Sequence, residues 1–325
     1  MEYGVFNYRR LLEIREMSLE ELSAYFRKLR SFEYDTNKPL QSSTLKKRMY
    51  FLTKLILKID RHLTGRKLII FNDRRENNID KGKVYASSHV GRYDIESAME
   101  AIGEQAYFVM GDPEETYRNF EGFFLDKLQG RICLDTGYNV SDIFKKHREG
   151  IPLTEEEQRT YDEYKKDRHI CEMTCTKRVA NKDNILIYPE GAWNVTPKLT
   201  QPLYKGAARI AINGNGVIVP IGIVRDKKEY TVNIGKEMDV TGACESDAKD
   251  ITNELRERMN SLTAEIIFSE NKLTHRATLK NAEENERDFI SDIMSESENG
   301  YTLEVIEKTR MYDPDDPVHV LKKII

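Results

Sequence analysis

The sequence predicts an α/β protein with a mixed central sheet flanked by helices. Three observations lead to this prediction. Short β-rich runs alternate with stretches of helical apolar spacing from about residue 68 onward, which is typical of an α/β layer fold. The region before residue 68 shows helical spacing alone. A chain of 325 residues is long enough to bury a sizeable core in one large domain that carries appendages at its two ends.

The changes in pattern divide the chain into three parts. Residues 1–67 are expected to form a helical N-terminal subdomain, with a break at Asn37-Lys-Pro39. Residues 68–270 are expected to form the α/β domain, which contains a charged helical insertion at 148–180. Residues 271–325 are very polar and are expected to form a C-terminal extension, docked as an appendage.

The α/β domain contains seven runs that predict strands. They are Leu68 to Phe71, Val84 to Ser87, Tyr107 to Met110, Ile132 to Leu134, Ile185 to Tyr188, Val217 to Val224 and Tyr230 to Ile234. An amphipathic helix is expected from about Ile251 to Phe268. The insertion carries Cys171 and Cys175 four residues apart, which predicts one face of a helix. Pro220 is expected to shape the end of its strand.

The composition narrows the expected binding partners and the expected cellular compartment. A net charge of −4 and a pI near 6.0 give no general attraction to nucleic acid, so we expect no nucleic-acid partner. The four cysteines lack a disulfide pattern, which fits a reducing compartment. The N-terminus has no apolar signal region, and no apolar run approaches the length of a membrane span. We therefore expect a cytoplasmic protein that meets a membrane, if it does, peripherally on its inner face.

Residues 44–63 predict a basic amphipathic helix. Its apolar face is expected to consist of Leu45, Met49, Leu52, Ile56, Ile59 and Leu63, with most lysines and arginines elsewhere. Such a helix can lie in the interface of an anionic bilayer, which makes a membrane surface one expected partner. The alternative is an ordinary helix that packs on the α/β domain and keeps its lysines in water.

The first candidate site is His89-Val-Gly-Arg-Tyr-Asp94, directly after a predicted strand. A histidine paired with a carboxylate at a strand end is typical of a base that takes a proton from a hydroxyl. We therefore expect His89 and Asp94 to be catalytic. Two alternatives use the same residues: a structural histidine with Asp94 as a helix N-cap, or a metal site of His89, Asp94 and Glu190. The sequence has no other metal motif, and so we expect no metal.

Further blocks follow in a defined order. The run Ile185-Leu-Ile-Tyr188 leads into Pro189-Glu-Gly191, which places a second carboxylate beside a glycine at a strand end. The other blocks are Gly130-Arg-Ile-Cys-Leu-Asp-Thr136 upstream, and Leu203-Tyr-Lys-Gly-Ala-Ala-Arg209 and Val217-Ile-Val-Pro-Ile-Gly222 downstream. With the His89 block, this ordered set resembles the PlsC-like glycerol-phosphate and lysophosphatidate acyltransferases, whose hallmark is H-x4-D. The resemblance covers about Lys83 to Gly235.

The resemblance implies an α/β core that transfers a fatty acyl group from acyl-CoA or acyl carrier protein to a hydroxyl of a glycerol-phosphate, lysophosphatidate or related lipid precursor. The donor is a co-substrate, and no cofactor is implied. A thioester is already activated, so the enzyme need only orient the hydroxyl, remove its proton and stabilise the oxyanion. His89 would be the general base, Asp94 would fix its tautomer, and backbone N–H groups around Gly91 or Gly191 would supply the oxyanion site.

The acceptor is less defined, because two arginines that the family usually carries are absent. Ala192-Trp-Asn194 follows the P-E-G block, and Thr136 ends the Gly130 block, at positions where arginine is usual. Arg92, Arg118, Arg131 or Lys205 could hold a phosphate instead. The alternative is an acceptor without that phosphate, stacked on Trp193. The residues expected to bind substrate are Arg92, Arg131, Glu190, Gly191, Trp193 and Lys205.

Some of these assignments remain open at this point. Glu190 can be functional, or it can pair with a loop cation or backbone N–H groups, and Trp193 can cap the core rim. The missing arginines leave room for a non-catalytic lipid or acyl-carrier binding protein of the same fold. Water in place of the acceptor would give an acyl-thioester hydrolase. The intact His89–Asp94 pair favours the O-acyltransferase.

Overall fold

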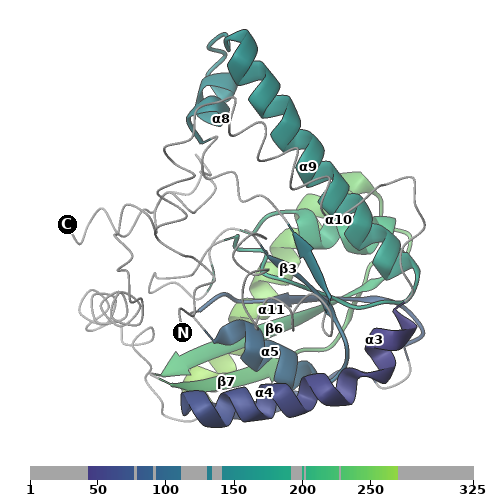
Figure 1. Ribbon diagram of the computed structural model, residues 1–325, viewed down its shortest axis with the longest axis vertical. Coiled ribbons are helices and arrows are strands. Elements are labelled where there is room, and N and C mark those ends of the chain that lie inside the picture. Colours follow the sequence, from purple (N-terminus) through teal and green to yellow (C-terminus); the bar gives the residue numbers. More distant parts are fainter. Residues whose placement is uncertain are drawn as a thin grey trace, which may run out of the picture.

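The computed structural model describes residues 43–76, 79–90, 93–110, 130–133, 141–191, 200, 203–226 and 228–269. In this part of the chain, an eight-stranded mixed sheet lies between helices on both faces (Figure 1). This confirms the predicted fold class. The three-part division of the chain stays a prediction, because residues 1–42 and 270–325 lie outside the described residues.

The sheet has the strand order β1-β7-β6-β2-β5-β3-β4, with β8 beside β6. The strands are β1 Lys67–Asp73, β2 Lys83–Ser87, β3 Tyr107–Met110, β4 Arg131–Cys133, β5 Ile185–Ile187, β6 Val217–Asp226, β7 Glu229–Ile234 and β8 Met238–Asp239. The run from β6 to β4 is parallel, whereas β7 and β8 pair with β6 in the antiparallel sense. All seven predicted strands are present; the two-residue β8 was missed because it is too short to show a pattern.

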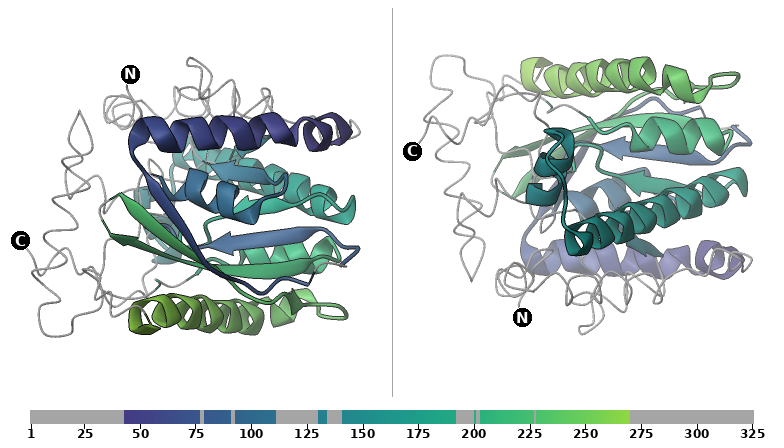
Figure 2. Two further views of the ribbon diagram at one scale, coloured as in Figure 1. Left: turned by 90° about the horizontal axis from the view of Figure 1, so that it is seen from below. Right: turned by 90° about the horizontal axis from the view of Figure 1, so that it is seen from above.

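Helices cover the two faces of the sheet. They are α3 Thr44–Arg48, α4 Tyr50–Thr64, α5 Asp94–Ile102, α8 Ser141–Arg148, α9 Glu155–Ala180, α10 Gly206–Asn213 and α11 Ala248–Ser269. Figure 2 shows α4 and α11 on opposite sides of the sheet. The helix α5 lies between α4 and the sheet, and α10 packs beside α11 on the other face. The long helix α9 packs on α10 at one end and projects from the body at the other, where α8 lies beside it (Figure 1).

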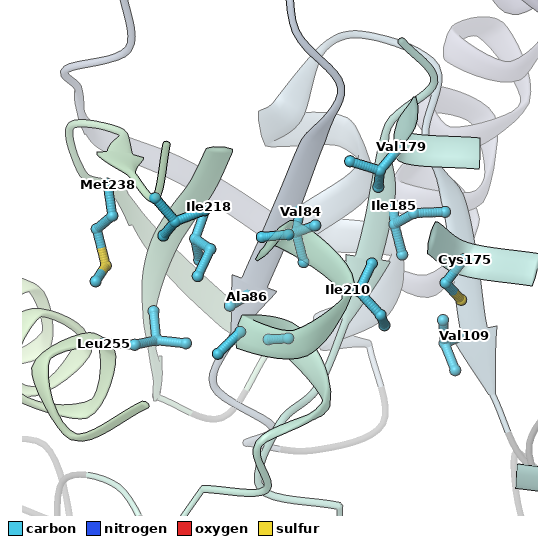
Figure 3. Packing of buried hydrophobic residues seen from close by; sticks show 14 of the residues in the cluster. Val84, Ala86, Val109, Cys175, Val179, Ile185, Ile210, Ile218, Met238 and Leu255 are labelled. Carbon is cyan, nitrogen blue, oxygen red and sulfur yellow. The ribbon is translucent and has the colours of Figure 1, made fainter. Parts of the chain in front are cut away.

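The central strand β2 is buried on both faces, because helices cover both sides of the sheet. Val84 and Ala86 point into the core under α10 and α11, which Figure 3 shows in part, and Tyr85 points to the opposite face. All three residues are fully buried. This explains why the sequence shows a short continuous apolar run here and not an alternating one. Cys171 and Cys175 lie on one buried face of α9, as their spacing predicted.

Pro220 lies inside β6 and not at its end, which corrects the expectation from the sequence. On the antiparallel side of β6, β8 pairs as far as Ile218 and β7 pairs only from Ile221 onward. Pro220 therefore falls in the gap between two partner strands, where a missing N–H is tolerated. Its carbonyl still accepts a hydrogen bond from the Gly235 N–H at 2.9 Å.

The helical face predicted for residues 44–63 is also corrected. The helical run is divided at Met49, and α4 turns Tyr50, Thr53 and Leu57 toward α5. The Tyr50 hydroxyl donates to the Met99 carbonyl of α5 at 3.4 Å. A second apolar arc, which consists of Phe51, Leu55, Ile59 and Leu63, faces outward with 50–79% of each residue exposed. The helix thus packs on the domain and still presents an apolar face.

Candidate active site

Two neighbouring strand ends form the candidate site. β2 and β5 are parallel, with Val84 opposite Ile185 and Ala86 opposite Ile187, so their C-terminal ends lie at the same edge of the sheet. The His89 loop follows β2, and the Pro189-Glu-Gly191 turn follows β5. In α/β sheets, this edge is where ligands usually bind. The strand order therefore brings together two blocks that are about a hundred residues apart in sequence.

His89 and Asp94 form a hydrogen-bonded pair at this edge. The Nδ1 atom of His89 lies 2.8 Å from Oδ2 of Asp94. The same carboxylate oxygen accepts the Val90 N–H. The Asp94 side chain is fully buried, and the His89 side chain is 10% exposed. Because the carboxylate accepts a hydrogen bond, Nδ1 carries the proton in the neutral imidazole and Nε2 is left with its lone pair.

Asp94 does not act as a helix N-cap. It is the first residue of α5, and the N-cap position is taken by Tyr93, whose side chain makes no capping hydrogen bond. A carboxylate in the first turn also interacts favourably with the positive end of the helix dipole. The structural alternative for Asp94 is therefore corrected: its carboxylate is directed at the imidazole and at the loop that carries it.

Glu190 links the two loops. Its Oε1 atom accepts a hydrogen bond from the His89 backbone N–H at 3.1 Å, and the residue is buried. This contact favours the structural interpretation of Glu190, in which the carboxylate pairs with backbone N–H groups. Among the described residues, no group of three or more His, Cys, Asp or Glu side chains is arranged to hold a metal ion.

Gly191 occupies a turn that requires glycine. Its φ is +70°, in the left-handed region, and a Cβ at this position would lie 2.6 Å from Cε2 of Tyr204. Its N–H donates to the Tyr188 carbonyl at 3.0 Å. That N–H is therefore engaged in closing the turn and does not supply the oxyanion site. The other candidate, Gly91, lies outside the described residues.

Of the remaining residues expected to bind substrate, Lys205 and Arg131 lie in the described part of the chain. Lys205 is exposed and immediately precedes α10, and its neighbour Tyr204 donates its N–H to the Pro189 carbonyl at 2.8 Å, which brings this segment to the P-E-G turn. Arg131 begins β4, and two strands separate β4 from β2, about 14 Å between strand axes. The other candidates, Arg92, Arg118 and Trp193, lie outside the described residues.

One contact of His89 was not expected from the sequence. The ring of Tyr188 lies against the imidazole, with 4.5 Å between ring centroids and 37° between the planes. The sequence placed Tyr188 only as the last residue of a strand, although an aromatic residue directly before a P-E-G turn is a signal that could have been noted. The structure thus brings together His89, Asp94, Tyr188 and Glu190.

Comparisons with known proteins give a match to a family model and a likeness to a solved structure. A family model described as "Acyltransferase" matches residues 70–224, from within β1 to within β6, and so includes His89, Asp94 and Glu190. The chain is also similar to the solved structure of the 1-acyl-sn-glycerophosphate (LPA) acyltransferase PlsC from Thermotoga maritima. The TM-score is 0.49 at 12% identity, over 78% of this chain and 98% of that one. No curated protein matches the chain.

Proposed function

We propose that this chain, whose residues 70–224 match the acyltransferase family model, moves a fatty acyl group from acyl-CoA or acyl carrier protein to a hydroxyl of a glycerol-phosphate, lysophosphatidate or related lipid precursor. The observation that carries this proposal is the buried hydrogen bond of 2.8 Å between His89 and Asp94 at the end of β2. It leaves Nε2 of His89 as a base for an incoming hydroxyl.

The proposed reaction has two bond changes at the thioester carbonyl. His89 Nε2 takes the proton from the acceptor hydroxyl while the hydroxyl oxygen attacks the carbonyl carbon. Asp94 stabilises the imidazolium that forms, because its buried carboxylate is hydrogen-bonded to Nδ1. The tetrahedral intermediate then collapses, the carbon–sulfur bond breaks, and the thiolate leaves with the proton returned by His89. The products are an ester and a free thiol.

The two candidate acceptors differ in whether they carry a negatively charged phosphate. Lys205 is the cation nearest in sequence to the P-E-G turn among the described binding candidates, and it could meet a phosphate at the mouth of the site. We therefore propose a phosphorylated acceptor. An unphosphorylated headgroup remains the second candidate, since neither of the family's usual arginines is present at its place in this sequence.

An acyl-transfer assay tests the function. The full chain is incubated with labelled acyl-CoA and acyl carrier protein thioesters and with a panel of hydroxyl acceptors, and the products are identified by mass. We expect an acylated product, formed faster with glycerol 3-phosphate or lysophosphatidate than with glycerol or monoacylglycerol. Equal rates on both sets would contradict the phosphate contact. Free thiol without any acylated acceptor would indicate a hydrolase, and binding without turnover would indicate a non-catalytic protein.

We also propose that the enzyme works peripherally at the inner face of a membrane, through α4. None of the helices in the described part of the chain is both long and apolar enough to cross a bilayer. The outward arc of α4, defined above as Phe51, Leu55, Ile59 and Leu63, is flanked by the exposed Lys54 and Lys58. Apolar side chains beside lysines are suited to the surface of an anionic bilayer. The helix packs on α5, which begins with Asp94, so this face and the site belong to one packed unit.

The double variant Leu55→Glu/Ile59→Glu is expected to bind anionic vesicles at least about tenfold more weakly, because two apolar side chains no longer enter the interface. Sedimentation with vesicles that contain phosphatidylglycerol measures this. The matched control is Ile151→Glu, which changes another exposed apolar residue away from α4 and should bind normally. Unchanged vesicle binding in the double variant would exclude α4 as the membrane face.

A further inference from the structure

Tyr188 contacts the imidazole of His89 but belongs to neither of the motifs that define the site. Its ring centroid lies 4.5 Å from that of His89, with the two planes tilted by 37°. The residue follows β5 directly and also packs against the core cluster on the α5 face of the sheet. Its ring is therefore held on one side by the core while it touches the imidazole.

Backbone contacts fix the same junction. The Tyr188 carbonyl accepts the Gly191 N–H, which closes the turn, and Glu190 in that turn accepts the His89 N–H at 3.1 Å. The loops after β2 and β5 are thus joined by a hydrogen bond at the backbone of His89 and by a ring contact at its side chain. Tyr188 directly follows β5, and the pairing of β5 with β2 brings its ring beside the imidazole.

We propose that Tyr188 is a positioning residue for His89: its ring, together with Asp94, fixes the direction of Nε2 and stabilises the imidazolium. This proposal rests on the proposed function, in which that imidazolium forms. A single hydrogen bond at Nδ1 fixes the position of that atom and does not by itself prevent a tilt of the ring about the bond. An aromatic ring against the imidazole limits this tilt, and an aromatic ring also attracts a cation that lies close to it.

The surroundings of Tyr188 keep its phenol neutral. In the described part of the chain, Asp94 and Glu190 accept hydrogen bonds from His89, and the negative charges of Asp94 and Glu96 act on Tyr188. Burial, followed by the negative charges of Asp94 and Glu96, raises the pKa of the Tyr188 phenol well above its ordinary value. The phenol therefore stays protonated across the working pH range, and its titration does not alter the contact with His89.

The test compares Tyr188→Leu with the matched variant Tyr188→Phe, which keeps the ring and removes only the hydroxyl. We expect Tyr188→Leu to lose about tenfold in kcat, with a smaller change in KM for the acyl thioester. Its acidic limb of kcat/KM should move to lower pH, because the imidazolium is stabilised less without the ring. Tyr188→Phe should retain activity within about twofold and keep the wild-type pH profile.

The same shift is measurable without turnover. The pH titration of the His89 imidazole is followed by NMR on histidine-labelled protein, with the signal assigned by its absence in His89→Ala. The midpoint should fall in Tyr188→Leu and stay in place in Tyr188→Phe. This NMR measurement tests the role of Tyr188 independently of acyl transfer, because the His89 midpoint can be compared between variants even in a chain that transfers no acyl group.

Two results would overturn the proposal. Equal losses in the Phe and Leu variants would assign the effect to the hydroxyl, and wild-type behaviour of the Leu variant would show that the ring does nothing for His89. Circular dichroism and thermal melting establish that each variant folds. If Tyr188→Leu does not fold, Tyr188→Met provides a second non-aromatic side chain, and the same two comparisons with Tyr188→Phe apply.

Discussion

The His89→Ala variant is expected to lose at least about a thousandfold in kcat/KM for acyl transfer while it remains folded. The loss follows because His89 is the base in the proposed mechanism, with its Nδ1 atom held by Asp94. His89 is not part of the hydrophobic core clusters, and Asp94 keeps the Val90 N–H as a hydrogen-bond donor in the variant, so we expect the fold to survive. Steady-state rates with a labelled acyl thioester measure the effect, and circular dichroism checks the fold.

The matched control for this variant is His169→Ala. His169 is an exposed histidine of α9 and has no part in the candidate site. Its removal should leave the rate unchanged. Substantial transfer by His89→Ala, at more than about a tenth of the wild-type rate, would show that another group removes the proton and would contradict the assigned mechanism.

Asp94→Asn is expected to reduce kcat by at least about a hundredfold. The amide has nearly the shape of the carboxylate, so the loop and the start of α5 should keep their conformation. It lacks the negative charge that stabilises the imidazolium, however, and its NH2 group can donate to the imidazole and favour the wrong tautomer. Transfer rates across the pH range measure the loss, which should appear in kcat more than in KM for the thioester.

Asp80→Asn is the control for the loss of one carboxylate. The Asp80 side chain is 85% exposed and pairs with Lys182, also largely exposed, so its replacement should change neither stability nor rate by much. A wild-type rate in Asp94→Asn would mean that the charge beside Nδ1 does not contribute to catalysis. In that case, the buried pair would have a structural role alone.

The sheet and the His89 loop were predictable from the sequence because their signals are local. Strands such as β2 are buried on both faces and therefore show as short apolar runs between turn residues. The histidine and aspartate are only five positions apart, so one loop and the first turn of α5 are enough to bring them together. The order of the motif blocks added the resemblance to a family, which one short motif could not have indicated.

The contact between Tyr188 and His89 was not predictable in the same way. It exists only because β5 lies beside β2, and nothing in the two segments themselves states which strands are neighbours. The turn at Gly191 posed a related problem, since the sequence indicated a special backbone position but not that its N–H would close the turn. Contacts between loops depend on topology, which local pattern does not fix.

The apolar face predicted for residues 44–63 differs from the structure for another reason. Both arcs of the helix carry apolar residues: Tyr50 and Leu57 pack inward, and Leu55 and Ile59 face outward. A periodic pattern identifies a helix, but it cannot decide which of two apolar arcs faces the protein. The division of the helical run at Met49 also changes the register that a continuous helix would have.

The most direct test of the central claim is the appearance of an acylated acceptor, detected by mass, when the wild-type chain is given an acyl thioester and a hydroxyl acceptor. The His89 mechanism predicts one ester formed for each thiol released by the wild-type chain, and neither product above background with His89→Ala. Ester formation at equal rates by both proteins would contradict it.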